Sequence, residues 1–101
     1  MARVIENSVV ALGGGHGLAA TLRALRQVTD TLTAVVGVAD DGGSSGRLRR
    51  EFGVLPPGDL RMALAALCAK DERAQEWADV LQHRFGGEGE LAGHAVGNVL
   101  M

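Results

Sequence analysis

The chain has 101 residues, a formal net charge of −2 at pH 7 and a pI of about 5.8. Its length predicts no more than one domain, and its slight acidity argues against a dedicated nucleic-acid-binding protein, whose domain more often carries a basic excess. The composition, 47% hydrophobic and 22% charged, is typical of a globular chain, and no apolar run approaches the roughly 20 residues that a membrane-spanning helix needs.

The first elements expected along the chain are a strand, a glycine-rich turn, a helix and a second strand. Residues 8–12 form a short continuous apolar run, which predicts a fully buried strand. Leucines at 18, 22 and 25 recur on one helical face and predict an amphipathic helix from about residue 17 to residue 27. The β-branched and apolar residues 32–39 predict a second strand. This order indicates a right-handed βαβ unit and a parallel, Rossmann-like α/β sheet.

A polar loop and a short helix are expected next. The loop covers residues 40–46, and the helix covers residues 47–52 with Ser44 or Ser45 as its N-cap. The basic run at its start is interpreted as a solvated helix face rather than a nucleic-acid patch. An arginine of this run that holds a phosphate is the alternative.

Two further helices are predicted in the second half of the chain. Pro56-Pro57-Gly58 indicates a rigid turn, after which Asp59 is the expected N-cap of one helix. A second helix begins near Asp71 and is expected to end at the glycines of residues 86–89. Residues 93–101 become increasingly hydrophobic without a stop signal.

The predicted sheet has two strands, which form a marginal sheet when they are alone. Buried parallel strands also need neighbours and helices on both faces. We therefore expect residues 1–101 to be the N-terminal portion of one larger domain, with an incomplete Rossmann-like parallel sheet and flanking helices. Cys68 is the single cysteine, and the first ten residues do not resemble a signal peptide, so a cytoplasmic location is expected.

Glycine makes up 15 of the 101 residues, roughly twice the average of about 7%, and it is densest after the first predicted strand. Gly15-x-Gly17-x-x-Ala20 matches the G-x-G-x-x-[G/A] pattern in its usual place between a strand and a helix. Glycines let backbone N–H groups approach a phosphate, and the helix dipole favours the anion. The predicted phosphate-binding residues are Gly13, Gly14, Gly15, His16 and Gly17. A turn that binds nothing is the alternative, and for His16 both ligand contact and simple exposure stay open.

Two adjacent acids, Asp40 and Asp41, end the second predicted strand. They lie about 20 residues beyond the glycine loop, where dinucleotide-binding folds place the acid that holds ribose hydroxyls. Two acids suggest a further contact, to a sugar hydroxyl or a metal-bound water, whereas an Asx turn or cap is the alternative. The small residues that follow add a second candidate anion site, formed by Gly42, Gly43, Ser44 and Ser45.

Polar residues further along the chain are weaker candidates. Asp59 is expected to cap its helix, with Arg61 on the first helical turn, and the alternative is that Asp59 or Arg61 lines the ligand cleft. His94 and Asn98 are spaced by four residues and are expected on one helix face that points to the ligand. The sequence contains no Ser-His-Asp arrangement, CxxC pair or HExxH motif, and the glycine loop lacks the Lys-Ser/Thr ending of a P-loop. We therefore predict neither a catalytic residue nor a resident metal.

Three blocks of the sequence resemble the YvcK family of gluconeogenesis factors. They are VVALGGGHGL, VADDGGSSGRLRREFGVLPPGDLRMAL and GHAVGN, and their order and spacing match over nearly the whole chain. That family is similar to the CofD-type 2-phospho-L-lactate transferases and shares their Rossmann-like architecture. Full-length members are roughly three times as long, which agrees with an incomplete domain.

The resemblance implies a cytoplasmic bacterial protein that binds UDP-sugars, notably UDP-N-acetylglucosamine, and supports gluconeogenic growth, wall synthesis and cell shape. It implies that the glycine loop faces the diphosphate, that Asp40 and Asp41 lie in the nucleotide-sugar cleft with Ser44 and Ser45, and that the remaining polar residues approach from the side. These last residues are Asp59, His94 and Asn98. His16 departs from the family, because many members have Thr at this position.

Three functions compete on this sequence. The first is a non-catalytic UDP-sugar-binding regulator that needs no cofactor, has wall-precursor enzymes as partners and has homo-oligomers as one candidate state. The second is a CofD-like transferase that uses Mg²⁺ held by Asp40 or Asp41 to move a phospholactyl or phosphoenolpyruvyl group. The third is an NAD(P)-dependent oxidoreductase, which rests on the βαβ pattern alone and fits the Asp-Asp-Gly-Gly-Ser-Ser block poorly. We expect no nucleic acid partner and no membrane insertion.

Overall fold

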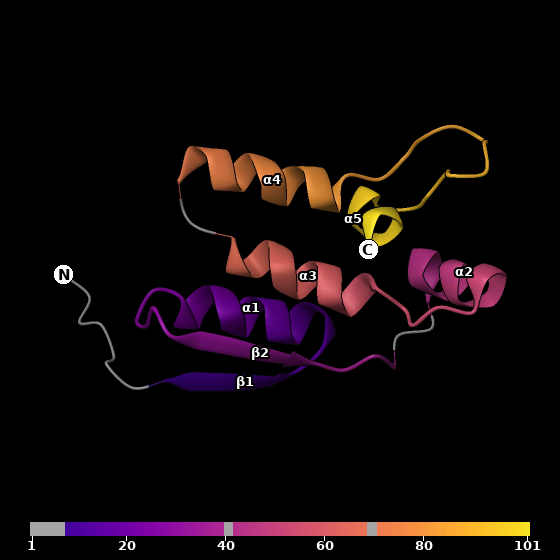
Figure 1. Cartoon of the computed structure of the whole chain (residues 1–101). Coiled ribbons are helices and arrows are strands. Elements are labelled where there is room, and N and C mark those ends of the chain that lie inside the picture. The colour runs from indigo at the N-terminus through magenta and orange to yellow at the C-terminus, as the bar shows by residue number, and fades with distance from the viewer. Residues whose placement is uncertain (1–7, 40–41, 69–70) are drawn as a thin grey trace.

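The computed structural model describes residues 8–39, 42–68 and 71–101, which form an α/β fold (Figure 1). The two strands pair in parallel, with Val9 opposite Leu32 and Gly13 opposite Val36. The predicted βαβ unit and parallel sheet are therefore confirmed. The elements in chain order are β1 (Val9–Gly13), α1 (Gly15–Leu25), β2 (Leu32–Val36), α2 (Gly43–Phe52), α3 (Gly58–Leu67), α4 (Glu72–Gln82) and α5 (Val96–Leu100).

The apolar core lies between the sheet, α1 and α3. Leu22 is fully buried and Leu18 is 5% exposed, because the leucine stripe of α1 faces inward as its spacing predicts. Small residues complete the contact and let the two helices approach closely. The buried members of this core are Ala11, Leu18, Ala19, Leu22, Ala63 and Ala66.

The helices form successive layers on one side of the sheet (Figure 1). Helix α1 lies on the strands, α3 packs on α1, and α4 packs on α3. Helices α2 and α5 lie together at the end of the molecule where the strands finish. Polar side chains at that end come from segments that are far apart in the sequence.

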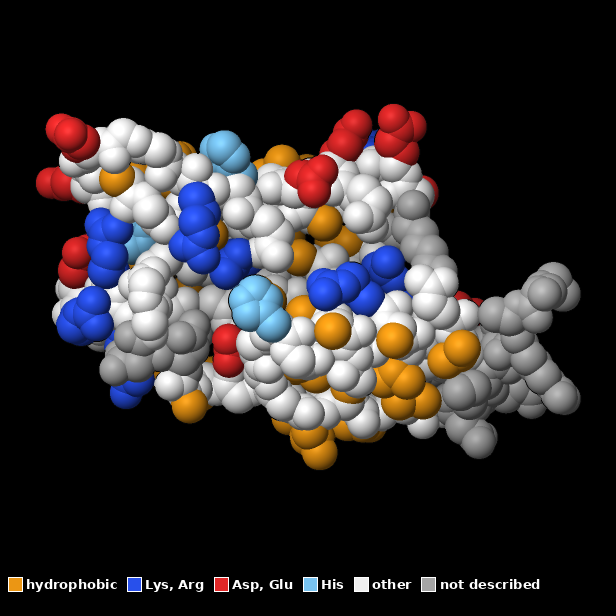
Figure 2. Space-filling model, turned by 180° about the vertical axis from the view of Figure 1, so that it is seen from behind, with side chains coloured by type: hydrophobic (Ala, Val, Ile, Leu, Met, Phe, Trp, Pro, Cys, Tyr) orange, Lys and Arg blue, Asp and Glu red, His pale blue; other side chains and the backbone are white. Residues whose placement is uncertain are grey.

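The other face of the sheet is exposed in the described part of the chain. Leu12 is 74% exposed and Val10 is 59% exposed, and Figure 2 shows hydrophobic side chains along this lower edge of the molecule. The prediction of a fully buried first strand is therefore wrong for this structure. The apolar run correctly indicated a strand, but helices cover one of its two faces only.

Several predicted helix ends also differ from the structure. Helix α2 begins at Gly43 rather than at residue 47, so Ser44 and Ser45 lie inside its first turn and Gly42 is the N-cap. Asp59 likewise lies in the first turn of α3, whose N-cap is Pro57. The reason is shared: a glycine or a fixed proline begins each helix before the polar residue that could cap it.

The expected start of α4 is confirmed, but its expected end is wrong. The Asp71 side chain accepts a hydrogen bond from the Ala74 N–H at 2.9 Å, as an N-cap does. The helix ends at Gln82, before the glycines that were expected to end it. These glycines lie in the loop that leads to Ala95, which forms an isolated antiparallel bridge with Arg84.

Candidate functional site

The N-termini of α1 and α2 open on one cleft of about 320 Å³, called here the α1–α2 cleft. Both helices begin at a glycine in the left-handed region, Gly15 at φ 61° and Gly43 at φ 50°, where other residues are strained. Neither N-terminus has a side-chain cap. Their first-turn N–H groups therefore remain available to a ligand, and the helix dipoles favour an anion. Other residues that line the cleft are His16, Ser45, Asp59, Arg61 and Arg84.

The carboxylate of Asp59 lies directly over the glycine loop. A Cβ atom added at Gly14 would stand 2.5 Å from Asp59 Oδ2, and one added at Gly15 would stand 3.7 Å from Oδ1. The absence of a side chain at Gly14 therefore permits this approach. Asp59 also places a negative charge beside the N-terminus of α1, so that a second anion there meets electrostatic repulsion.

A second, more apolar hollow of about 450 Å³ lies where the two strands end. Its lining includes Gly13, Gly37 and Ala39, and Asp59 borders it as well as the α1–α2 cleft. The carboxyl end of parallel strands is the usual ligand position in open α/β sheets. Asp59 therefore stands between a polar cleft and an apolar hollow that together can accept a ligand with a polar and an apolar part.

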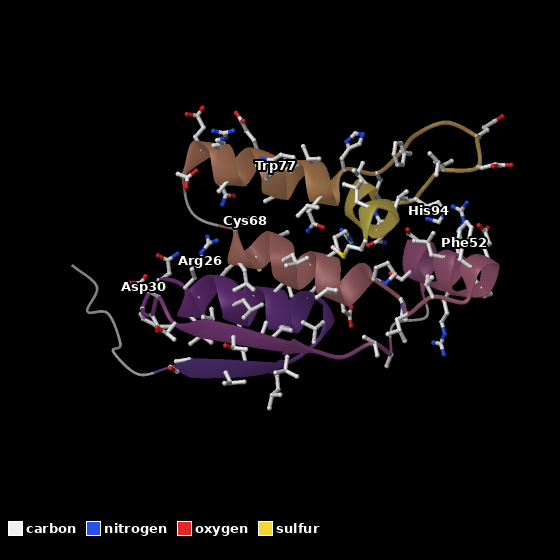
Figure 3. The ribbon with its side chains drawn as sticks, in the orientation of Figure 1. Arg26, Asp30, Phe52, Cys68, Trp77 and His94 are labelled. Carbon is white, nitrogen blue, oxygen red and sulfur yellow. The ribbon has the colours of Figure 1, made fainter. Side chains whose placement is uncertain are left out.

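A chain of buried hydrogen bonds starts at Ser44. Asn98 Nδ2 donates to Ser44 Oγ at 3.1 Å, and Ser44 Oγ lies 2.7 Å from His94 Nδ1. The direction of the Ser44–His94 hydrogen bond follows the imidazole tautomer: Ser44 donates when His94 carries its proton on Nε2, and it accepts when the proton is on Nδ1. His94 is 2% exposed and lies between α5 and α2 in Figure 3.

Arg61 continues the chain of hydrogen bonds on the side of α3. Its Nε donates to Asn98 Oδ1 at 2.9 Å, and its Nη1 donates to Gln82 Oε1. Arg61 is 6% exposed and Asn98 is 3% exposed, so the positive charge polarises the Asn98 amide in a region of low dielectric, whereas Gln82 is the exposed end of the chain of hydrogen bonds. The buried polar chain, as we name it, thus runs through Gln82, Arg61, Asn98, Ser44 and His94.

Two arginines attach the loop before α5 to the rest of the molecule. Arg47 of α2 donates to the carbonyl oxygens of Ala92 and, at 2.9 Å, Glu90. Arg84 donates to the Gly93 carbonyl at 2.8 Å. Arg47 is half-buried, so the interpretation of the basic run as a solvated face is wrong for this residue. The interpretation fits Arg49 and Arg50, which are exposed.

The structure brings most of the predicted site residues to one end of the molecule. Gly15, His16 and Asp59 line the α1–α2 cleft beside the start of α2, and His16 is exposed there. Gly13 and Gly14 line the neighbouring hollow. Gly17 lies in the first turns of α1, with nothing near the position of a Cβ atom. Asp40 and Asp41 lie outside the described residues.

His94 and Asn98 differ from their expected arrangement. His94 precedes α5, so the two residues do not share one helical face, although both contact Ser44. Asn98 borders the α1–α2 cleft, whereas His94 lies behind Ser44. Sequence reasoning missed Gln82 and Arg84 altogether. No local sequence signal identifies them, because Gln82 accepts from the Arg61 side chain and Arg84 donates to the Gly93 carbonyl, and both contacts form only through tertiary packing.

Among the described residues, no group of three or more His, Cys, Asp or Glu side chains is placed to hold a metal ion. None of the described helices is both long and apolar enough to cross a membrane.

The family model described as 2-phospho-L-lactate transferase CofD matches residues 9–101. A protein of Mycobacterium leprae named "Putative gluconeogenesis factor" is 65% identical over 94 residues, which are 93% of this chain and 26% of that protein. A Listeria innocua protein named "Gluconeogenesis factor" is 45% identical over all of this chain and 30% of its own length. A crystal structure of a Bacillus halodurans protein has a TM-score of 0.80 and 44% identity, over 94% of this chain and 30% of that one. The chain thus spans about a quarter to a third of the length of these relatives.

Proposed function

The chain belongs to the family of the 2-phospho-L-lactate transferase CofD, and on this premise we propose that it is a gluconeogenesis factor that binds a nucleotide sugar. The ligand proposed is UDP-N-acetylglucosamine. The protein would act in the cytoplasm as a regulator of gluconeogenic growth, wall synthesis and cell shape, through wall-precursor enzymes as partners. No resident cofactor is needed for this role.

The observation that carries the proposal is the convergence of two uncapped helix N-termini on the α1–α2 cleft. Backbone N–H groups at helix N-termini suit the phosphates of a diphosphate. Arg61 and Arg84 line the same cleft and add positive charge. The apolar hollow beyond Asp59 suits the nucleoside or the sugar.

A regulatory rather than catalytic role is supported by the state of the side chains in the described residues. His94 is buried behind Ser44 and hydrogen-bonds its hydroxyl, and this pair belongs to the buried polar chain that joins α2 to the segment before α5. His16 is exposed at the cleft, and within the described residues no side-chain hydrogen bond orients it. Binding without turnover is the simplest chemistry for such a site.

Isothermal titration calorimetry tests the proposal. The protein is expected to give a saturable signal with UDP-N-acetylglucosamine and none with N-acetylglucosamine alone, because the cleft recognises the diphosphate. The nucleotide sugar is expected to be recovered unchanged. Absence of heat from protein whose circular dichroism shows it to be folded would overturn the proposal.

The name of the matched family favours one second candidate, a CofD-like transferase. It would move a phospholactyl or phosphoenolpyruvyl group from a nucleotide donor, with Mg²⁺ held by Asp40 or Asp41. Incubation with such a donor, an acceptor and Mg²⁺ would then yield free nucleotide, and Asp41→Asn would abolish the yield. Unchanged donor in the presence of folded protein and Mg²⁺ would eliminate this candidate.

A further inference from the structure

Arg26, at the C-terminal end of α1, carries a guanidinium that lacks an acceptor within the described residues. Its Nε and Nη1 atoms are buried, and neither has a hydrogen-bond partner there. Arg47 and Arg61, the other described arginines that are not exposed, both donate to acceptors. Burial of a cation without a partner destabilises a fold. A carboxylate or another oxyanion against Arg26 would reduce this penalty.

The end of α1 does not supply the missing acceptor. Arg26 is the C-cap, and the last carbonyl groups of the helix already accept from backbone N–H groups; these carbonyls belong to Leu22, Ala24 and Leu25. Figure 3 shows the Arg26 side chain extending toward the end of α3, whereas Asp30 lies on the turn before β2. Because Arg26 as a whole is half-buried, part of its side chain is accessible from outside. An acceptor can therefore approach from a second molecule.

Arg26 belongs to a basic row on α1. Arg23 precedes it by three residues, which places both side chains on one face of the helix, and Arg23 is exposed. Figure 2 shows basic side chains in a row along the middle of this face of the molecule. Neither arginine lines the α1–α2 cleft or the hollow at the strand ends. The basic row, defined as Arg23 and Arg26, is thus separate from the candidate nucleotide-sugar site.

The first half of α4 carries the opposite charge. Its N-cap Asp71 is exposed, and so are three further acids of the helix, among which Arg73 is the one basic residue of Glu72–Gln82. Figure 2 shows acidic side chains above the basic row, at the same end of the molecule. We call these residues the acidic row; they are Asp71, Glu72, Glu76 and Asp79.

The two rows lie side by side on one face, which makes that face complementary to itself. A two-fold axis in the plane of contact, parallel to the rows and between them, places the basic row of each molecule against the acidic row of the other. Figure 2 also shows hydrophobic side chains between the rows, which such a contact would bury. This charge complementarity favours a second copy of the chain over an unrelated acidic partner, because one symmetric contact pairs both rows.

We propose that two copies of this chain associate through this face, with the basic row of each against the acidic row of the other. The guanidinium charge is delocalised, so a carboxylate at the accessible part of Arg26 compensates the burial of the rest. Pairs of fully exposed charges contribute little, so Arg26 is expected to contribute more than Arg23. Arg26 lies at the other end of α1 from the α1–α2 cleft, so the association leaves that cleft open.

Sedimentation equilibrium of the purified chain at low ionic strength measures the association. The chain is expected to form a dimer whose Kd rises as salt is added. Arg26→Glu is expected to raise this Kd about tenfold or more, because the changed charge enters two symmetry-related contacts. Arg50→Glu, at an exposed arginine of α2, makes the same change in net charge and is the matched control.

Arg26→Met is the second variant, in case the added carboxylate prevents folding. It is also expected to weaken the dimer. At concentrations where the protein is monomeric, its Tm is expected to equal or exceed that of the unaltered chain, because an unpaired buried charge has been removed.

Mixing two variants tests the symmetry of the contact. Glu72→Arg combined with Glu76→Arg is expected to dissociate the dimer as Arg26→Glu does. An equimolar mixture of this double variant with Arg26→Glu is expected to associate again, because both symmetry-related contacts then join opposite charges. Restored association in the mixture alone supports the proposal.

Several outcomes would overturn it. One is a monomer at every concentration, and another is a dimer that both Arg26 variants leave unchanged or that Arg50→Glu weakens equally. A third is a monomer whose Tm inorganic phosphate raises, with the rise lost in Arg26→Met. That result would assign Arg26 to a free anion rather than to a second copy.

Discussion

The apolar core and the buried polar chain hold neighbouring parts of this molecule by different physical means. The core joins β1, β2, α1 and α3 through leucine and alanine side chains. The polar chain joins α2, α3, α4 and α5 through hydrogen bonds among five side chains. Burial of apolar area is non-directional, whereas each hydrogen bond requires a donor and an acceptor in register. The candidate site is bordered by the hydrogen-bonded side chains, and these tolerate less displacement than the apolar core does.

The polar chain also differs from the core because it lies beside an open cleft. The core fills its space with side chains, whereas the polar chain borders the α1–α2 cleft through Ser44, Arg61 and Asn98. Under the proposed function, apolar packing that filled this cleft would exclude the nucleotide sugar. We therefore expect mutations to separate stability from binding more clearly at the α2 end than in the core.

The largest effect is expected in the core, from Leu22→Ala. Leu22 is fully buried, and its truncation should lower the free energy of unfolding by about 2–5 kcal/mol, from lost burial and the cavity that remains. Urea denaturation followed by circular dichroism measures this. Leu12→Ala removes the same atoms from a side chain that is 74% exposed and should change stability by less than about 0.5 kcal/mol. Equal losses in the two variants would contradict the position of the core.

Gly97→Ala is expected to disturb the polar end next most strongly. The added Cβ atom would stand 2.8 Å from the Leu81 carbonyl oxygen and 2.9 Å from Arg61 Cγ, so α5 must move away from α4. Overpacking of this kind lowers stability by about 1–3 kcal/mol. Thermal unfolding checks it against Gly86→Ala, where nothing lies near the new atom. A Tm for Gly97→Ala that matches the control would show that the close approach is not required.

Asn98→Ala tests the polar chain at its centre. It removes the acceptor of Arg61 Nε and one of the two partners of Ser44 Oγ, and the loss of these buried hydrogen bonds should lower stability by about 1–3 kcal/mol. A double-mutant cycle with Ser44→Ala should give a coupling energy of at least about 0.5 kcal/mol. The cycle with Leu22→Ala, which shares no partner with Asn98, should be additive. If the stability changes were additive in both cycles, Asn98 would be coupled to Ser44 no more strongly than to the core, and the polar chain would not act as a unit.

The smallest effect is expected at Asp71, which caps α4, the outermost helix of the layers. Asp71→Ala removes the acceptor of the Ala74 N–H and should lower the free energy of unfolding by about 0.5–2 kcal/mol. Asp79→Ala, an exposed change in the same helix, should stay within about 0.5 kcal/mol. Chemical denaturation of both variants makes the comparison. A loss confined to Asp79→Ala would contradict the assignment of the cap.

Sequence reasoning succeeded where the signal is local. The leucine spacing of α1, the strand–turn–helix–strand order and the cap at Asp71 all follow from residues within a few positions of one another. It failed at Ser44, Ser45 and Asp59, each predicted as an N-cap, because a glycine or proline began the helix earlier. It also predicted a buried first strand, since an apolar run identifies a strand without showing which faces will be covered.

The sequence by itself determined the parallel α/β class, the glycine turns and the family resemblance that the comparison confirms. The tertiary structure alone decided that Ser44 is engaged by His94 and Asn98. The partners of Ser44 are 50 and 54 residues away in the sequence, and Arg61 reaches Asn98 across 37 residues. Hydrophobic periodicity is repeated along a segment, whereas a hydrogen bond between distant side chains exists only after packing has set their positions.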